Sequence, residues 1–574
     1  MANQESFWVL PETQNIPEAL PRLGLPKLAL ALLCRRGYQD KSAIEEFLNP
    51  SLARLHNPKL LPDMEKAVER ILAAIKKKER ILVYGDYDVD GTCGTALLVR
   101  VLRKIGANAS FYIPHREREG YGLSETGVLF AKENGFSLIV TTDCGTTDFM
   151  EIEMSNNSGI DVIVCDHHEP KDALPKALAI INPKRHDADY PFKELAGVGV
   201  SFKLAWALLS ASGNSKEDLT EHLDLVALGT IADVAPLLDE NRALAKFGML
   251  KIKDTKKVGL RALLKIAGLS GKTITPYEIG FMLGPRINAS GRISEAGKAV
   301  ELLITEDEKR AEEIVKELDL ENQKRQKIEE EILIKASDQV ERMDLDKKRF
   351  LVLADETWHE GVVGIVASRI AEKFYRPTIL IALKEDRGKG SGRSIPGFHL
   401  YQALKNCETH LLGFGGHKYA AGLTISRENI NRFSDFIDEY TKNNTTEELF
   451  QKKVFIDAQT SLYDFDDEFL KTLAKFEPFG PENPEPVFVT TGLEVVGYPK
   501  IVGKDKEHLR FKVRENKDRV LDVIAFGKSE AILKLVKGQE DHLDIVYYLD
   551  ENSFAGKTKM QLKIKDMRIR NQGV

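Results

Sequence analysis

Residues 81–84, an apolar run with the sequence ILVY, lead directly into the acidic segment GDYDVDG. This segment places carboxylates at alternate positions: Asp86, Asp88 and Asp90. Carboxylates packed this closely repel one another, so a divalent cation is the natural reason for the arrangement, although a polar surface turn remains the alternative. An EF-hand calcium loop is disfavoured because Leu97 occupies the twelfth position, counted from Asp86, where such a loop carries Glu.

Two further apolar runs, residues 138–142 and 162–165, also end in polar side chains. The residues that follow them are Asp143 after the first run and Asp166, His167 and His168 after the second. One such residue could be a helix cap, but three acidic or histidine-bearing ends in one sheet indicate a shared site at its carboxyl edge. Imidazole together with carboxylates favours Mn²⁺ or Mg²⁺ over a thiolate-rich zinc site. Asp233, directly after the apolar run in GTIADVAPL, is a further candidate ligand.

The spacing of apolar residues predicts an α/β fold. Strand-like runs at 81–84, 110–113, 137–141 and 162–165 alternate with helical segments, which is typical of βαβ units around a parallel sheet. Residues 306–342 form a highly charged helix with one narrow apolar seam. A second α/β region follows, and beyond about residue 443 short alternating strands predict a small β-barrel or sandwich.

Composition narrows the class of protein. The chain has 574 residues, of which 43% are hydrophobic and 30% charged, as in an ordinary globular protein and unlike a disordered or fibrous one. The net charge of −6 gives no global signal for nucleic acid, so a polyanion would have to be held by local patches or by metal. Five scattered cysteines argue against a disulfide framework. The absence of a leader or a long apolar stretch predicts a cytoplasmic protein with no membrane association.

Several motifs together resemble those of a known superfamily. DYDVDG, TTDCG, DHH and GTIADVAPL, in this order, resemble the four motifs of the DHH phosphoesterase superfamily. The rest of the chain is similar to the RecJ single-stranded-DNA exonucleases in six further motifs: IPHREREGYGLS, GPRINASGR, WHEGVVGIVASRI, GSGRSIPGF, GFGGHKYAAG and FEPFGPENPEPVF. The resemblance extends from about residue 21 to near the C-terminus, so it covers almost the whole chain.

The resemblance implies a domain order and a fold. It predicts an N-terminal segment at 1–63, a parallel-sheet DHH domain at 64–305, a connecting helix at 306–345, a smaller α/β DHHA1 domain at 346–442, and an all-β, OB-like DNA-binding domain at 443–574. A run of basic residues between 500 and 519 fits single-strand binding by such an OB fold, although a solvated strand face is the commoner meaning of such a run.

The resemblance also implies roles for individual residues. The ligands of one or two Mn²⁺ or Mg²⁺ ions would be Asp88, Asp90, Asp143, His167 and Asp233, with Asp86 as an additional ligand. His168 would contact the scissile phosphate or act as an acid, and Asp166 would orient its neighbours. Related pyrophosphatases carry a ligand His four residues before the position of Asp88, where this chain has Tyr84.

The Gly-rich turns of the second α/β region suit a phosphate that backbone N–H groups approach closely. We expect these turns and the GPRINASGR motif to clamp the DNA phosphates, although the turns could instead be purely structural. The substrate-binding candidates are Arg286, Asn288, Ser391, Arg393, Gly415, Gly416 and His417.

The implied activity is that of a metal-dependent, single-stranded-DNA-specific 5′→3′ exonuclease that releases mononucleotides in DNA repair and recombination. A single-strand-binding protein and a helicase are the implied partners. One alternative is a small-substrate phosphodiesterase acting on oligonucleotides or cyclic dinucleotides, which the OB-like segment and Tyr84 disfavour. The other is a non-catalytic replication scaffold, which the intact acidic and histidine motifs disfavour.

Overall fold

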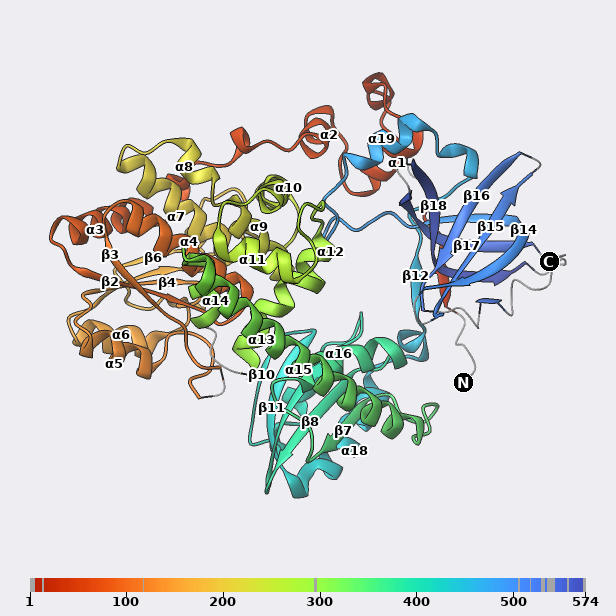
Figure 1. The fold of residues 1–574 in the computed structure, drawn as a ribbon. Helices are drawn as coiled ribbons and strands as arrows, with labels where there is room; N and C mark the ends of the chain where they lie inside the picture. Colours follow the sequence, from red (N-terminus) through yellow and green to blue (C-terminus); the bar gives the residue numbers. More distant parts are fainter. Residues whose placement is uncertain are drawn as a thin grey trace. The chain divides into compact units, whose positions relative to one another are not determined.

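The computed structural model describes residues 6–12, 15–116, 118–293, 297–503, 506–516, 518–527, 532–533, 542–554 and 557–570. The chain divides into two units. The larger unit comprises residues 51–450 together with 480–482, and the smaller comprises residues 1–50, 451–479 and 483–574. The smaller unit therefore combines the red and the blue ends of the ribbon (Figure 1).

The first sheet of the larger unit is parallel, with the strand order β3-β2-β4-β5-β6, which confirms the parallel sheet predicted from the sequence. Its strands are β2 (Arg80–Gly85), β3 (Asn108–Tyr112), β4 (Leu138–Thr142), β5 (Asp161–Cys165) and β6 (Ala179–Ile181). The direction of winding reverses at β2, which lies between β3 and β4. In open α/β sheets, a ligand crevice forms at such a reversal, outside the carboxyl ends of the strands. The strands that meet there are those that precede Asp86 and Asp143.

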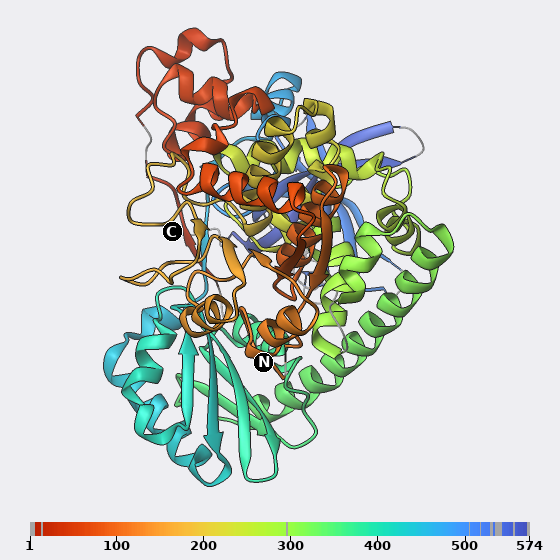
Figure 2. The ribbon, with the colours of Figure 1, turned by 90° about the vertical axis from the view of Figure 1, so that its left-hand side faces the viewer.

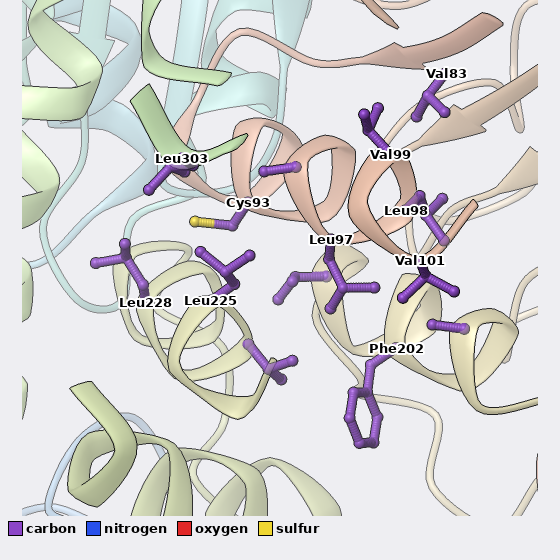
Figure 3. Close-up of a cluster of buried hydrophobic side chains, with 14 of the residues drawn as sticks. Val83, Cys93, Leu97, Leu98, Val99, Val101, Phe202, Leu225, Leu228 and Leu303 are labelled. Carbon is purple, nitrogen blue, oxygen red and sulfur yellow. The ribbon is translucent and has the colours of Figure 1, made fainter. Parts of the chain in front are cut away.

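Alternate side chains of this sheet enter two different apolar cores. Ile81 and Val83 face a cluster with α3 (Met64–Lys76), α4 (Val89–Lys104) and α7 (Gly197–Ala211), whereas Leu82 and Tyr84 face a cluster with α5 (Glu125–Glu133) and α6 (Phe149–Asn157). Helix α4 is buried along most of its length. Figure 3 shows its Cys93, Leu97 and Val101 among side chains of α7 and α9 (Leu223–Ala232). The acidic segment at the start of α4 is thus anchored to the core.

A helical layer completes the first half of the larger unit. Its remaining helices are α8 (Lys216–Thr220), α10 (Asp239–Lys253), α11 (Val258–Ile266), α12 (Pro276–Glu278), the π-helix η4 (Ile279–Leu283), α13 (Gly284–Ile293) and α14 (Gly297–Ile304). The charged segment forms α15 (Glu308–Glu341), a continuous helix of 34 residues.

The second sheet of the larger unit has the order β10-β11-β9-β8-β7, and only β7 and β8 are parallel. Its strands are β7 (Leu351–Asp355), β8 (Thr378–Lys384), β9 (Arg387–Arg393), β10 (Gly413–Gly416) and β11 (Ala420–Ser426). One face packs on α15 and α16 (Val363–Phe374), and the other on α17 (Leu400–Asn406) and α18 (Ile430–Asn444). Figure 2 shows these strands in teal, beside the long green helix.

The smaller unit contains a closed barrel, which confirms the predicted all-β region. Its strands are β14 (Phe488–Val502), β15 (His508–Glu515), β16 (Arg519–Ala525), β17 (Leu543–Phe554) and β18 (Lys557–Ile569). They pair in the order β14-β15-β16-β18-β17, and β17 returns to β14 to close the ring. The barrel core also includes side chains of α1 (Lys27–Arg35), α2 (Lys41–Leu48) and α19 (Asp467–Ala474).

A further pairing joins β1 (Phe7–Val9) to β12 (Lys453–Phe455), and the two strands run parallel. Residues near the N-terminus therefore belong to the same folded unit as the barrel. The domain boundaries proposed from the sequence motifs stay predictions. Every helix among the described residues is too short or too polar to cross a membrane.

Candidate metal centre and phosphate-binding pocket

The acidic segment after β2 turns directly into helix α4. Asp88 is the N-cap of this helix, and its Oδ1 accepts a hydrogen bond from the backbone N–H of Gly91 at 3.0 Å. Asp86 precedes the cap and Asp90 lies in the first turn, and both are almost fully buried. Negative charge is favourable at a helix N-terminus, so the start of α4 tolerates carboxylates that an apolar core would exclude.

Asp90 is held by the start of helix α7. Its two carboxylate oxygens accept hydrogen bonds from the backbone N–H groups of Gly197, at 2.6 Å, and Val198, at 2.9 Å. A Cβ atom at Gly197 would lie 2.7 Å from Asp143 Oδ1 and 2.9 Å from Asp90 Oδ2. A Cβ atom at Gly229 would lie 2.8 Å from Asp90 Oδ1. The two glycines therefore permit the close approach of α7 and α9 to these carboxylates, a role that the sequence analysis did not anticipate.

His167 lies at the centre of the carboxylates. Its Nε2 atom is 3.0 Å from Asp143 Oδ1, 3.9 Å from Asp233 Oδ2 and 4.0 Å from Asp90 Oδ2. Asp233 is the C-cap of α9, and Asp143 has a φ of +63°, in the left-handed region that Asp adopts more readily than most residues. Four separate segments of the chain thus deliver their side chains to one point.

The donor atoms fit a divalent cation. Three groups of donors each lie within 4.8 Å of one another: Asp86, Asp88 and Asp143; Asp90, His167 and Asp233; and Asp143, His167 and His168. Within the described part of the chain, Asp86 Oδ1, Asp143 Oδ1 and His167 Nε2 are buried and form no hydrogen bond, although the last two atoms lie 3.0 Å apart. Buried polar atoms are rarely left unpaired, and oxygen donors with one imidazole suit Mn²⁺ or Mg²⁺. The predicted ligands therefore lie together as a candidate metal centre.

Burial and mutual repulsion shift the pKa values of these groups. Burial, followed by the neighbouring carboxylates, raises the pKa of Asp86, Asp90 and Asp143, and the pKa of Asp233 rises to about 7. Burial also lowers the pKa of His167 to about 4, which keeps its imidazole neutral, as a metal ligand must be. Without a cation, the carboxylates are thus held in an unfavourable environment.

Asp166 and His168 form a second layer around the cluster. Asp166 Oδ1 is 2.8 Å from His168 Nδ1, and its Oδ2 accepts a hydrogen bond from the N–H of Thr146 at 2.9 Å. Burial alone would raise the pKa of Asp166, but its hydrogen bond with His168 lowers it below the usual range. Burial opposes the positive charge of His168, but its hydrogen bond with Asp166 favours that charge, and the pKa of His168 is raised. Asp166 thus orients His168, whose side chain is 42% exposed.

Tyr121 is a site residue that the sequence analysis missed, although it lies within the quoted motif IPHREREGYGLS. Its hydroxyl donates to the backbone oxygen of Asp143 at 3.0 Å and lies 2.9 Å from His168 Nδ1. Tyr84, in contrast, packs in the apolar cluster with α5 and donates to the backbone oxygen of Gly122 at 3.0 Å. A Tyr in a polar motif can serve either purpose, so only the tertiary structure distinguishes the two roles.

A pocket of about 490 Å³ lies between the GDYDVDG half of the larger unit and the second sheet. Arg116 lines it from the first half, and Ser391 and Gly415 line it from strands β9 and β10. The guanidinium of Arg393 donates to Ser391 Oγ at 3.1 Å. Burial, followed by the charge of Arg116, lowers the pKa of Arg393. The lining also contains Lys389, in an ion pair with Glu360 at 3.2 Å. Arg116 in the lining and Arg393 bonded to Ser391 place guanidinium groups beside glycine backbone, an arrangement suited to an anion.

The other predicted phosphate-binding residues lie in different surroundings. Gly416, the last residue of β10, has a φ of +137°, and the N–H of His417 donates to Ala420 O at 2.8 Å, so the chain turns between these residues and β11. Arg286 Nε forms an ion pair with Asp319 at 2.9 Å, and its Nη1 donates to Met282 O at 2.7 Å. Asn288 lies half-buried on α13. Their contribution to substrate binding stays a prediction.

Comparison with known proteins places the chain in a family. Profiles of the DHH family N-terminal domain, the DHHA1 domain and the RecJ OB domain match residues 80–230, 347–443 and 456–566. The single-stranded-DNA-specific exonuclease RecJ of Escherichia coli (strain K12) is 37% identical, over 97% of this chain and 97% of its own length. The chain belongs to the RecJ family. RecJ of Bacillus subtilis (strain 168) is 39% identical, over 97% of this chain and 70% of its own length.

RecJ crystal structures confirm the fold. The structure of RecJ from Thermus thermophilus in complex with Mn²⁺ matches with a TM-score of 0.81 at 32% identity, and the match covers 99% of this chain and 80% of that one. The complex of the same RecJ with Mg²⁺ matches with a TM-score of 0.74 at 31% identity, over 98% of this chain and 78% of that one. The sequence-based assignment to the DHH and RecJ families is thus confirmed.

Proposed function

We propose that this chain is a metal-dependent, single-stranded-DNA-specific exonuclease that acts from the 5′ end and releases mononucleotides. The observation that carries the proposal is the combination of an acidic–histidine cluster with a cationic pocket in the same unit. The RecJ relatives named above are single-stranded-DNA-specific exonucleases, and each match covers 97% of this chain. They support the substrate class.

The side chains of the cluster suit phosphodiester hydrolysis. Asp86, Asp88, Asp90, Asp143, His167 and Asp233 would hold one or two Mn²⁺ or Mg²⁺ ions. Such ions lower the pKa of a water molecule and neutralise charge on phosphate oxygens. His168, oriented by Asp166, can donate a hydrogen bond to the phosphate through its partly exposed imidazole. Tyr121 fixes both His168 and the backbone of Asp143.

The pocket accounts for attack near a strand end. Arg116, Ser391 and Arg393 can hold a terminal phosphate through charge-assisted hydrogen bonds, and Gly415 lets backbone approach it. A terminal phosphate bound in this pocket would fix the distance from the strand end to the metal centre. After each cleavage, the new terminal phosphate would bind in the same place, and the phosphodiester bond at the same distance from the end would lie at the metal centre. We assign this phosphate to the 5′ end. We further propose cytoplasmic action in DNA repair and recombination, with a single-strand-binding protein and a helicase as partners.

The test uses single-stranded oligonucleotides labelled at either end, with and without a 5′-phosphate, in Mn²⁺, in Mg²⁺ and after chelation. We expect metal-dependent release of mononucleotides from the 5′ end and slow cleavage of duplex DNA. Arg393→Ala should raise the KM of the phosphorylated strand roughly 10–100-fold and abolish its advantage over the unphosphorylated one. Arg387→Ala, an exposed residue of the same strand β9, is the matched control. Digestion from the 3′ end would refute the polarity, and activity in the absence of metal would refute the mechanism.

A further inference from the structure

The loop between β3 and α5, residues 113–124, reaches both parts of the candidate site. Arg116 lines the pocket, and its guanidinium carbon lies 5.0 Å from the ring centroid of Tyr87, in the acidic segment GDYDVDG. The hydroxyl of Tyr121 lies 2.9 Å from His168 Nδ1. The side chain that lines the pocket and the one that contacts His168 are thus carried by one short piece of backbone, which we call the bridging loop.

Glu119 joins the two ends of the bridging loop. Its Oε2 atom accepts hydrogen bonds from the hydroxyl of Tyr112, the last residue of β3, at 3.0 Å, and from that of Ser124, the N-cap of α5, at 2.5 Å. Its Oε1 atom accepts a hydrogen bond from the backbone N–H of His115 at 2.7 Å. A carboxylate offers only acceptors, and its charge-assisted hydrogen bonds are stronger than neutral ones. A single side chain therefore closes the loop across its base.

Tyr84 and Asp148 hold the backbone beside Tyr121. The hydroxyl of Tyr84 accepts a hydrogen bond from the N–H of Ser124 at 3.1 Å and donates to Gly122 O at 3.0 Å. Gly122 has a φ of +88°, and a Cβ atom there would lie 2.6 Å from Oδ2 of Asp148, the N-cap of α6. The glycine thus lets the loop approach α6 closely. The position at which related pyrophosphatases carry a ligand His anchors the bridging loop in this chain.

We infer that Glu119 is a positioning residue that fixes Arg116 relative to Tyr121 and thereby fixes which phosphodiester bond is cleaved. The inference rests on the proposed nuclease function, in which Arg116 holds the terminal phosphate and Tyr121 orients His168. Without the Glu119 carboxylate, the two ends of the loop are held less tightly, so the terminal phosphate and the metal centre can move relative to each other. Such displacements matter because reaction requires the reacting atoms to lie within about 3–3.5 Å. A loosened loop would therefore present either the first or the second bond from the strand end.

The first test compares the wild type with Glu119→Gln on single strands that carry a labelled 5′-phosphate. The amide keeps the size of the side chain but lacks the charge and one acceptor oxygen. Under single-turnover conditions, the wild type should release labelled mononucleotide alone, and the variant a mixture of labelled mononucleotide and dinucleotide. The KM of the variant for the phosphorylated strand should rise roughly tenfold, and the advantage of this strand over an unphosphorylated one should shrink accordingly. The rise in melting temperature on addition of Mn²⁺ should persist, because the predicted metal ligands are unchanged.

Tyr84→Phe is the second variant, because it removes one hydroxyl and loosens the same loop from strand β2. It should also release labelled dinucleotide in addition to mononucleotide. Glu125→Gln is the matched control, because Glu125 is an exposed glutamate in the first turn of α5. The control should release mononucleotide alone, with the KM of the wild type. Thermal unfolding of all variants measures any loss of stability separately.

The outcomes separate the positioning role from a purely structural one. Lower melting temperatures of Glu119→Gln and Tyr84→Phe, with unchanged product length and phosphate advantage, would overturn the inference. Fluorescence anisotropy after chelation measures strand binding without cleavage. A wild type that prefers phosphorylated strands but does not cleave them, together with loss of this preference in Glu119→Gln, would refute the proposed function and support the positioning of Arg116. An equal preference in the wild type and Glu119→Gln would overturn the positioning role.

Discussion

Asp143 combines a metal-ligand position with a left-handed backbone, so the choice of substitution decides what a variant reports. Asp143→Asn keeps a side chain that tolerates this backbone and removes the charge. We expect kcat/KM to fall at least roughly a hundredfold, because the carboxylate contributes to cation binding. We also expect Mn²⁺ to raise the melting temperature of the wild type and not of the variant. More than a tenth of the wild-type rate at saturating Mn²⁺ would contradict the assigned ligand.

Gly197 tests the packing of α7 against the carboxylates. Gly197→Ala would place a methyl group 2.7 Å from Asp143 Oδ1, so Asp143 or the helix must shift. We expect Mn²⁺ affinity and kcat to fall roughly tenfold or more, as when groups that orient metal ligands are altered. Gly199→Ala is the control, because its nearest neighbour is Leu195 Cδ2 at 3.3 Å, a flexible side chain. Calorimetric Mn²⁺ titration of both variants measures the difference, and equal affinities would show that Gly197 is not required.

Glu485 makes the stability of the folded protein depend on pH, independently of the metal centre. Burial raises its pKa from the ordinary value of 4.5 to about 7, so the folded state binds this proton more tightly than the unfolded state. Its contribution to stability is therefore complete below about pH 4.5 and is lost as the pH rises through about 7. We expect Glu485→Gln to be more stable than the wild type at pH 8 and to show a smaller loss between pH 5 and 8. Denaturant unfolding, with exposed Glu507→Gln as the control, measures this; equal pH slopes would contradict it.

For single residues, the sequence predicts which polar side chains share the site when they follow a strand closely. The reason is that the carboxyl ends of parallel strands meet at one edge of the sheet. Asp86, Asp143 and His167 are of this kind, and the structure brings them together. Tyr121 and Gly197 could not be assigned in the same way. Their roles depend on how closely other segments approach them in space, and a tyrosine or glycine at those positions is equally compatible with a core or a turn.

Helix α15 carries a buried ionic group in its middle. Arg325 Nη1 is 2.7 Å from Glu329 Oε2, and Arg369 of α16 lies 2.9 Å from Glu329 Oε1. Glu329→Ala would leave Arg325, which is 8% exposed, without its carboxylate. We expect the free energy of unfolding to fall by about 3 kcal/mol, whereas exposed Glu331→Ala in the same helix should change it by less than about 0.5 kcal/mol. Denaturant unfolding of both variants gives the comparison, and similar effects would show that the buried group contributes nothing.

The helices and strands themselves were largely predictable because their apolar residues recur at regular spacing. The helix expected at 306–342 is α15, and the strand expected at 81–84 is β2, longer by one residue at each end. The π-helix η4 was not predictable, because the apolar spacing of residues 279–283 does not distinguish a π-helix from an α-helix. The packing of α1 and α2 on the barrel was also not predictable, because an amphipathic helix does not specify its partner.

The larger unit has its own apolar cores on both of its sheets, so residues 51–450 are expected to fold on their own. We expect this fragment to bind Mn²⁺ and to cleave very short oligonucleotides at nearly the rate of the full chain. Its affinity for long strands should fall at least roughly tenfold, because stacking and backbone contacts scale with the nucleotides covered. Parallel losses on short and long strands would show that the barrel instead maintains the metal centre.

The division of the smaller unit between both chain ends has a consequence for synthesis on the ribosome. Helices α1 and α2 emerge before the strands that cover their apolar faces, which follow only after roughly 400 residues. At a translation rate of about 5–20 residues per second, these apolar faces remain uncovered for roughly 20–80 s. During that interval the larger unit can complete its own cores. Helices α1 and α2 are therefore the segments most in need of a chaperone, and the barrel can close only after β18 has been translated.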